Sequence, residues 1–274
     1  MTVNAAEAPN TESPYPEFPG VDPYGTRRPA EFEREHRQRT AAIGYRIFAT
    51  QRWGQLGDGH ISARDPEWTD HFWMLDWGIP FGQATVDHLV LVGPGGRVRD
   101  LAGDYTGAVN TAGYNIHAPL LEARPDVVSA AHTHTQFGTP WSANVEPFKA
   151  ISQESCAYVF DQALFDDEEV EVLTYDGGKR IAAALGSAKL CILRNHGLLT
   201  VGQTVEEAVG WFVMAERVAE VHVKAPNAKP ISDEAAAVAA STVGDRHAGW
   251  RVFQWLAAGL ADHGFRPGHQ TRPG

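Results

Sequence analysis

The hydrophobic and polar positions of this chain repeat with two periods, one typical of strands and one typical of helices. Short apolar runs predict strands at 71–75, 87–92, 97–99, 127–132, 158–160, 170–174, 189–193 and 198–201. Apolar residues recur at helical spacing at about 30–53, 114–124, 136–142, 179–185, 204–225 and 232–263. Strands and helices alternate without a long linker, so the pattern predicts a single α/β domain.

Proline and glycine mark the segments that do not fit either period. Residues 1–29 hold six of the 17 prolines and little apolar periodicity, which predicts an irregular arm. The glycine-rich stretch 54–62 is read as a loop, either a plain turn or a place where backbone amides approach an anion. Residues 93–96 predict a hairpin, since no helix follows them. We expect the domain to span 30–226, with a helical extension at 227–274.

Composition narrows the kinds of protein that this chain can be. The net charge of -11 argues against nucleic acid or an anionic membrane as the main partner. No apolar run approaches the roughly 20 residues that span a bilayer, and the first residues lack a basic region followed by an apolar one. Two cysteines, Cys156 and Cys191, do not make a disulfide framework. We expect an acidic cytoplasmic protein.

Two of the predicted strands end in histidine. The run that contains Val127 and Val128 stops at His132-Thr-His134, and the run that contains Cys191 stops at Asn-His196-Gly. Residues i and i+2 of a strand point to the same face, so His132 and His134 can converge on one ion. Neutral imidazole suits zinc, iron, copper and nickel. A third histidine from a second strand is the build expected for an open three-ligand site.

A less specific interpretation stands beside this one. A single His-x-His at the end of a strand is often plain polar structure. The second histidine at a strand end, His196, is what favours a metal site over that interpretation.

Three stretches of this chain resemble the class II aldolase/adducin family. They are GDGHIS at 57–62, YNIHAPLLEARPDVVSAAHTHT at 114–135 and CILRNHGLLTVGQTVEEAVGWF at 191–212. The resemblance covers about residues 35–225 in the same order. It implies a central, mostly antiparallel sheet flanked by helices, and a homotetramer with its sites at subunit boundaries. It also implies that His132, His134 and His196 are metal ligands.

The chain departs from the pattern of the family's sugar-phosphate aldolases. Those enzymes carry a metal-binding, proton-moving glutamate four residues before the histidine of the helix, and here Gly113 stands four before His117. Their G-N-x-S phosphate loop reads Gly-His60-Ile-Ser here, and Thr111-Ala112 replaces their serine pair. Their tyrosine acid falls near Gln153. Retro-aldol cleavage needs a base and an acid, and the sequence offers no clear replacement.

Three functions remain open at this stage. The first is a non-haem Fe(II) enzyme that uses O2 to decarboxylate an aryl 2-oxo acid, as in the family's aminocoumarin-type prenylated 4-hydroxyphenylpyruvate oxygenases. The second is Zn(II) or Mn(II) Lewis-acid chemistry on a small carbonyl compound, with His117, His60, Asp87 or a group from the neighbouring subunit moving the proton. The third is an adducin-like scaffold without catalysis. We favour the first, with His117 and Gln153 as catalytic candidates and His60 and Arg194 as substrate-binding candidates.

Overall fold

An eight-stranded mixed sheet forms the centre of the protein in a computed structural model that describes residues 29–99 and 107–260. The strands are β1 (Gly59–Arg64), β2 (Phe72–Leu75), β3 (Leu89–Gly93), β4 (Arg97–Arg99), β5 (Ser129–Thr133), β6 (Gln162–Phe165), β7 (Leu190–Leu193) and β8 (Gly197–Gly202). Their order is β4-β3-β2-β1-β5-β8-β7-β6. All neighbours pair antiparallel except β6 and β7, which are parallel. The mostly antiparallel sheet is confirmed.

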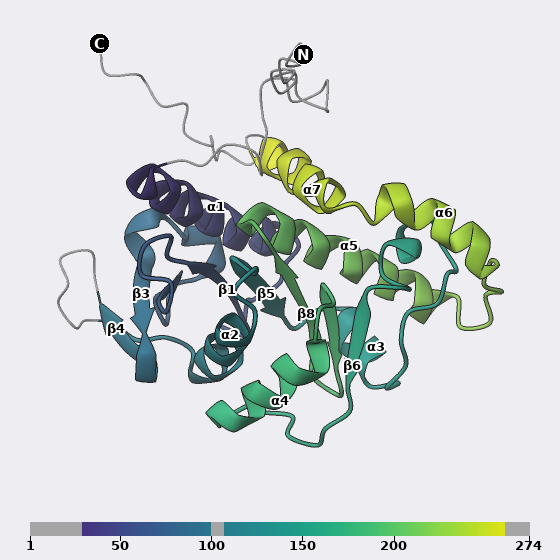
Figure 1. The fold of residues 1–274 in the computed structure, drawn as a ribbon, viewed down its shortest axis with the longest axis horizontal. Helices are drawn as coiled ribbons and strands as arrows, with labels where there is room; N and C mark the ends of the chain where they lie inside the picture. The colour runs from purple at the N-terminus through teal and green to yellow at the C-terminus, as the bar shows by residue number, and fades with distance from the viewer. Residues whose placement is uncertain (1–28, 100–106, 261–274) are drawn as a thin grey trace, which may run out of the picture.

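Helices cover both faces of this sheet (Figure 1). The α-helices are α1 (Ala30–Thr50), α2 (Thr111–Ala123), α3 (Gly138–Ser142), α4 (Tyr175–Leu185), α5 (Val205–Lys224), α6 (Asp233–Val243) and α7 (Arg246–Gly259). One apolar core joins α1, α5 and α7 to one face, and a second joins α2 and α4 to the other. The α/β architecture predicted from the sequence is therefore confirmed.

The long helix α5 shows how the sequence determines these layers. The hydroxyl of Thr204 accepts a hydrogen bond from the backbone amide of Glu207, which caps the first turn. Val209, Phe212 and Ala215 recur at helical spacing and are fully buried against the sheet. Burial of this apolar face stabilises the helix more than its propensity does.

The three strands that matter most for function lie side by side. Strand β5 pairs with β1 on one side and with β8 on the other. Register places His132 directly opposite His60 in β1 and Leu199 in β8. Residues alternate between the two faces, so Ala130 joins the α2 and α4 core while Ala131 joins the α1 and α5 core. His60 and His132 therefore lie on the α2 face of the sheet.

Three local predictions are wrong. Residues 158–160 form a turn rather than a strand, because Tyr158 donates its amide to Ser155 and its hydroxyl to the carbonyl of Trp211 inside the core. The strand follows at β6 instead. Residues 170–174 pair with no described strand. The loop at 54–62 gives way to β1 at Gly59, whose added Cβ would lie 2.5 Å from Thr133, so this glycine serves close strand packing.

The described residues test only part of the predicted division into an arm, a domain and a C-terminal extension. The proposed arm, 1–29, lies outside the described residues apart from Pro29. Residues 232–263 form the helix pair α6 and α7 as far as residue 260, and Phe253 of α7 is buried in the same core as α5. The boundary at residue 226 stays a prediction. No helix among the described residues is long and apolar enough to cross a membrane.

Candidate metal centre

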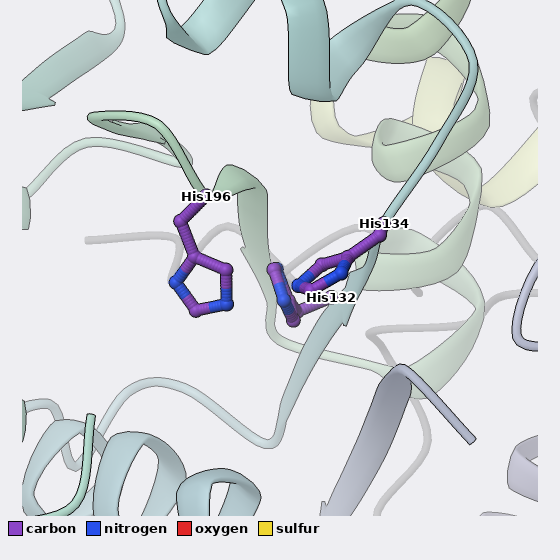
Figure 2. Close-up of side chains that lie close together, drawn as sticks. All are labelled: His132, His134 and His196. Atoms are coloured by element: carbon purple, nitrogen blue, oxygen red, sulfur yellow. The ribbon is translucent and has the colours of Figure 1, made fainter. Parts of the chain in front are cut away.

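Three histidine rings converge at one end of the central strands (Figure 2). Each of His132, His134 and His196 offers one ring nitrogen, and these three nitrogens lie within 4.8 Å of one another. The ring centroids are 4.6 Å apart for His132 and His196, 5.0 Å for His134 and His196, and 5.4 Å for His132 and His134. Nitrogens at this spacing can share one cation.

The backbone fixes how two of the rings are presented. Nδ1 of His132 lies 2.7 Å from the carbonyl oxygen of Leu198, so it carries the proton and leaves Nε2 free as a ligand atom. His196 lies in the tight turn between β7 and β8, where its amide donates to the carbonyl of Leu193. Asn195 adopts a φ of 53° there, a conformation that asparagine tolerates better than most residues.

A buried carboxylate holds the chain just after His134. Glu216 of α5 accepts hydrogen bonds from the hydroxyl of Thr135 at 2.6 Å and from the amides of Phe137 at 2.8 Å and Gly138 at 2.6 Å. Burial raises the pKa of Glu216, and these three donors oppose that rise. The carboxylate thereby fixes the turn that presents the His134 ring.

Burial keeps several of these imidazoles neutral. The pKa of His132 lies well below its ordinary value, because burial and then the neighbouring histidines disfavour its charged form. The same causes, burial first and then His134, lower the pKa of His196 to about 4. A metal ligand must be a neutral imidazole, so these two residues are ready to bind at neutral pH.

A second histidine chain runs behind the three rings. Nδ1 of His60 lies 2.6 Å from Nε2 of His117, and Nδ1 of His117 lies 2.5 Å from Oγ of Ser62. The His60 ring also packs on His132, with centroids 4.9 Å apart. Burial lowers the pKa of His117 to about 3, so it is a neutral link between two hydrogen bonds.

Gly113 makes room for this arrangement. A Cβ atom added to Gly113 would lie 2.8 Å from Cδ2 of His60 and 2.9 Å from its Cγ. The imidazole therefore lies against the backbone of α2 at the position where the sugar-phosphate aldolases of the family carry their glutamate. His60 is thus the group that fills this space.

A cavity of about 890 Å³ opens onto the three rings. Its wall includes His60, Asn110 and the segment 170–173, which was predicted to be a strand. Among the described residues that line it there is no lysine or arginine, and Asp58 and Glu171 are its carboxylates. This described part of the wall does not favour a phosphate group, because it offers no lysine or arginine and carries two acids.

Two of the predicted site residues lie elsewhere. Gln153 is exposed just before a short 3₁₀ helix and does not line this cavity. Arg194 follows β7, but its guanidinium pairs with Asp166 at 2.8 Å and approaches Glu168 at 3.5 Å. The structure therefore brings His60 and His117 to the cluster, and it does not bring Gln153 or Arg194.

Sequence reasoning missed the supporting groups. Glu216 occupies a position of α5 where the apolar repeat predicts a core residue, since it lies four residues after Phe212. A carboxylate on the buried face of a helix was the available signal. The Ser62 hydroxyl and the Leu198 carbonyl had no signal in the sequence.

The three nitrogens fit a divalent transition metal. They are imidazole nitrogens presented where strands of the sheet end, and at least one is oriented by a backbone acceptor. In the described ranges 29–99 and 107–260, no carboxylate or cysteine joins this group of three. Three protein ligands leave coordination positions for a substrate.

Comparison with known proteins identifies the family. The model of the class II aldolase and adducin N-terminal domain matches residues 39–223, which is more than half of the chain. The chain belongs to the class II aldolase and adducin family. The matched range contains all three histidines and the strands β1, β5 and β8, so the observed site lies within the family's domain.

Individual class II aldolase relatives extend this match. The chain is 35% identical over 248 residues to the 4-hydroxy-3-prenylphenylpyruvate oxygenase/4-hydroxy-3-prenylbenzoate synthase of Streptomyces roseochromogenus subsp. oscitans, covering 87% of this chain and 88% of that protein. It is also 35% identical to the decarboxylase NovR of Streptomyces niveus, over 87% and 90% of the two chains. Both relatives are named as enzymes, which supports the interpretation of this chain as an enzyme.

A class II aldolase of known structure shares the fold. The L-fuculose 1-phosphate aldolase from Glaciozyma antarctica PI12 superposes with a TM-score of 0.77 at 34% identity, covering 86% of this chain and 94% of that one. This chain is therefore about equally similar in sequence to proteins named as an oxygenase, a decarboxylase and an aldolase. Sequence identity does not choose among these activities, so the choice depends on the residues that line the cavity.

Proposed function

We propose that this protein is a metal-dependent oxygenase that oxidatively decarboxylates an aryl 2-oxo acid in secondary metabolism. The observation that carries the proposal is the pairing of Gly113 with His60 beside three histidines. It removes the carboxylate of aldol chemistry from the site and replaces it with a neutral imidazole. The similarity to an enzyme named as a prenylphenylpyruvate oxygenase supports the same conclusion.

His132, His134 and His196 would hold the metal. A bound Fe(II) would supply redox chemistry with O2 and open positions for the carboxylate and oxo group of the substrate. The role of the protein is then to present three imidazoles in a fixed geometry. The carbonyl of Leu198 and the carboxylate of Glu216 supply that geometry through His132 and through the turn after His134.

His60 is the residue that we propose to meet the substrate. Its Nδ1 is already engaged with His117, so Nε2 is the ring nitrogen left to face a ligand in the cavity. His117 and Ser62 orient the ring from behind and exclude water from that side, because both are fully buried. We assign His117 the role of a positioning residue, since His60 lies between it and the cavity.

The overall reaction balances with O2 as the oxidant. Conversion of an aryl pyruvate to a benzoate removes two carbon atoms as CO2 and consumes two molecules of O2, with one molecule of water formed. The 2-oxo acid is oxidised and dioxygen is reduced. This stoichiometry separates the reaction from a plain decarboxylation, which releases CO2 without taking up O2.

A metal-dependent aldolase is the second candidate. It is supported by the likeness to the L-fuculose 1-phosphate aldolase, and Zn(II) or Mn(II) would then polarise a carbonyl. Oδ2 of Asp58 lies 3.7 Å from Nδ1 of His134 and would be an acid for such a reaction. The absence of a cation from the described cavity wall disfavours a phosphorylated substrate.

Metal reconstitution tests the proposal. The protein is stripped with a chelator and recharged with Fe(II), Zn(II) or Mn(II) in separate samples. Each form is then mixed with 4-hydroxyphenylpyruvate or with its 3-prenyl derivative, and O2 uptake is measured with an oxygen electrode. We expect O2 uptake only with Fe(II). Anaerobic product formation with Zn(II) or Mn(II) would instead establish lyase chemistry, and no turnover with any metal would favour a scaffold.

The assembly belongs to the same proposal. We propose a homotetramer, as the family resemblance implies. Light scattering coupled to gel filtration is expected to give about four times the chain mass of 29.9 kDa. A monomer mass would contradict it.

A further inference from the structure

A second cavity adjoins the one that opens onto the histidines. It has a volume of about 520 Å³ and lies between the end of α1, the strand β2 and the turn that follows β2. We call it the side cavity. Its apolar wall includes Tyr45, Trp53, Met74, Leu75, Ile79 and Phe81.

The side cavity shares part of its wall with the histidine cavity. Gly59, His60, Trp77 and Asn110 line both. A ligand that fills the space beside His60 can therefore extend into either cavity. Trp77 stands at this junction, and 55% of its surface is exposed although its ring is apolar. Aromatic side chains such as this one are common in the walls of ligand pockets.

The chemistry of the wall selects an uncharged group. Within the part of the chain that the structure describes, no lysine or arginine lines the side cavity, and Asp76 is its one carboxylate. That carboxylate already accepts a hydrogen bond from the amide of Ala108 at 2.8 Å. A charged substituent would lose its hydration here without gaining a partner, whereas a hydrocarbon group would be stabilised.

The volume sets the size of that group. A cavity of roughly 150 Å³ is enough to hold benzene, so 520 Å³ accommodates a branched chain of about five carbon atoms beside part of an aromatic ring. We propose that the side cavity binds an apolar substituent of this size on the aromatic ring of the substrate, and that it determines which aryl acids the enzyme accepts. This inference rests on the proposed function, because it places the 2-oxo acid end at the histidines.

Two positions allow the side cavity to be filled without touching the histidines. Ala49 lies in the last turn of α1 and lines only this cavity. Gly82 lines it beside Ala49, and a Cβ added there would have the Ala49 side chain as its nearest contact at 3.6 Å, which is ordinary van der Waals distance. Leucine at either position takes up space that the substituent needs. Ala184→Leu, on the exposed side of α4, is the matched control.

Binding of unreactive acids tests the inference. Calorimetry compares 4-hydroxybenzoate with 4-hydroxy-3-prenylbenzoate on the metal-loaded full chain, and neither compound carries the 2-oxo group that turnover requires. Each buried methylene contributes roughly fourfold in affinity, so a partly buried five-carbon group is expected to tighten binding at least about tenfold. Ala49→Leu and Gly82→Leu should abolish that difference, while Ala184→Leu retains it.

The outcomes separate this inference from the proposed function. Equal affinity for the two acids in the unmodified protein overturns the inference that the side cavity binds the substituent. The inference is also overturned if Ala49→Leu and Gly82→Leu melt at the same temperature as Ala184→Leu and both still prefer the prenylated acid as strongly as the unmodified protein does. A prenyl preference without any O2 uptake supports the side cavity and overturns the oxygenase. Equal O2 uptake with the prenylated and the unprenylated substrate supports the oxygenase and overturns the role proposed for the side cavity.

Discussion

Gly113 and His60 fit together so closely that a side chain on residue 113 would collide with the His60 ring. The imidazole occupies the volume in which a side chain on residue 113 would stand, 2.8 Å from the nearest ring carbon. Through that fit the ring reaches both His117 and the space beside His132. A glycine within α2 is unfavourable for the helix by itself, so its presence is explained by the contact that it permits.

Gly113→Ala is expected to displace His60. Alanine gains roughly 0.5–1 kcal/mol of helix propensity, but overpacking a buried site costs roughly 1–3 kcal/mol. We therefore expect a net loss of stability and a fall in activity of roughly tenfold or more, with metal content unchanged. Urea unfolding, metal analysis and turnover measure these three effects.

Gly259→Ala provides the control for that variant. This glycine ends α7 and an added Cβ has no neighbour within 4 Å, so the change is expected to be neutral or slightly stabilising. If Gly113→Ala behaves like Gly259→Ala, the fit between Gly113 and His60 has no functional consequence.

His134→Ala is expected to remove metal and activity while leaving the fold. The His134 ring supplies one of only three nitrogens in the group, and its side chain is 43% exposed, so its loss leaves no large buried void. Metal affinity should fall by at least roughly a hundredfold, given that changes outside the ligand shell alone cost 10–100-fold. Metal analysis and circular dichroism measure the two effects, and His88→Ala is the control. Retained metal in His134→Ala would contradict the ligand assignment.

The sequence predicted the parts of this structure that local pattern controls. The two apolar runs that stop at His132 and His196 formed neighbouring strands, and their histidines met as expected. It failed where tertiary contacts decide the outcome. Residues 158–160 have strand-like composition, yet the Tyr158 hydroxyl is drawn to the carbonyl of Trp211 and the segment turns. The contact between His60 and Gly113 depends on how α2 packs on β1, which no local pattern encodes.

Glu216→Gln tests the support of the His134 turn. The carboxylate accepts three hydrogen bonds with two oxygens, and an amide would set its NH2 group against a donor. We expect a loss of about 1–3 kcal/mol in the free energy of unfolding and a roughly 10–100-fold weaker metal affinity.

Glu220→Gln is the companion variant on the same helix. Glu220 pairs with Lys224 at the surface, where such pairs contribute at most about 0.5 kcal/mol. Equal metal affinity in the two glutamine variants would show that Glu216 supports the fold without tuning the metal centre.

The buried histidines predict an acid-sensitive fold. The pKa of His117 falls from 6.5 to about 3 on folding, because burial disfavours its charged form. A group with a lowered folded pKa stabilises the fold above its unfolded pKa, and this contribution declines as pH falls from 6.5 toward 3. In chelator, the free energy of unfolding should therefore decrease from pH 7.5 to pH 5.5.

His117→Gln isolates the contribution of this residue. The variant should be less stable at pH 7.5 because the link to His60 and Ser62 is altered. Its decline with falling pH should be shallower by up to about 1.4 kcal/mol per pH unit, since one titrating group is removed. Parallel pH profiles for the two proteins would contradict the assignment of a neutral His117.

The three ligand histidines differ in how far they lie from solvent. His132 is 1% exposed and His196 is intermediate, while His134 lies at the surface of the group. A bound ion would therefore be reached from solvent on the His134 side, while His132 stays buried in β5. We therefore expect that one preparation of folded protein can be stripped and recharged with each metal in turn, so that the different metal forms are compared on the same protein.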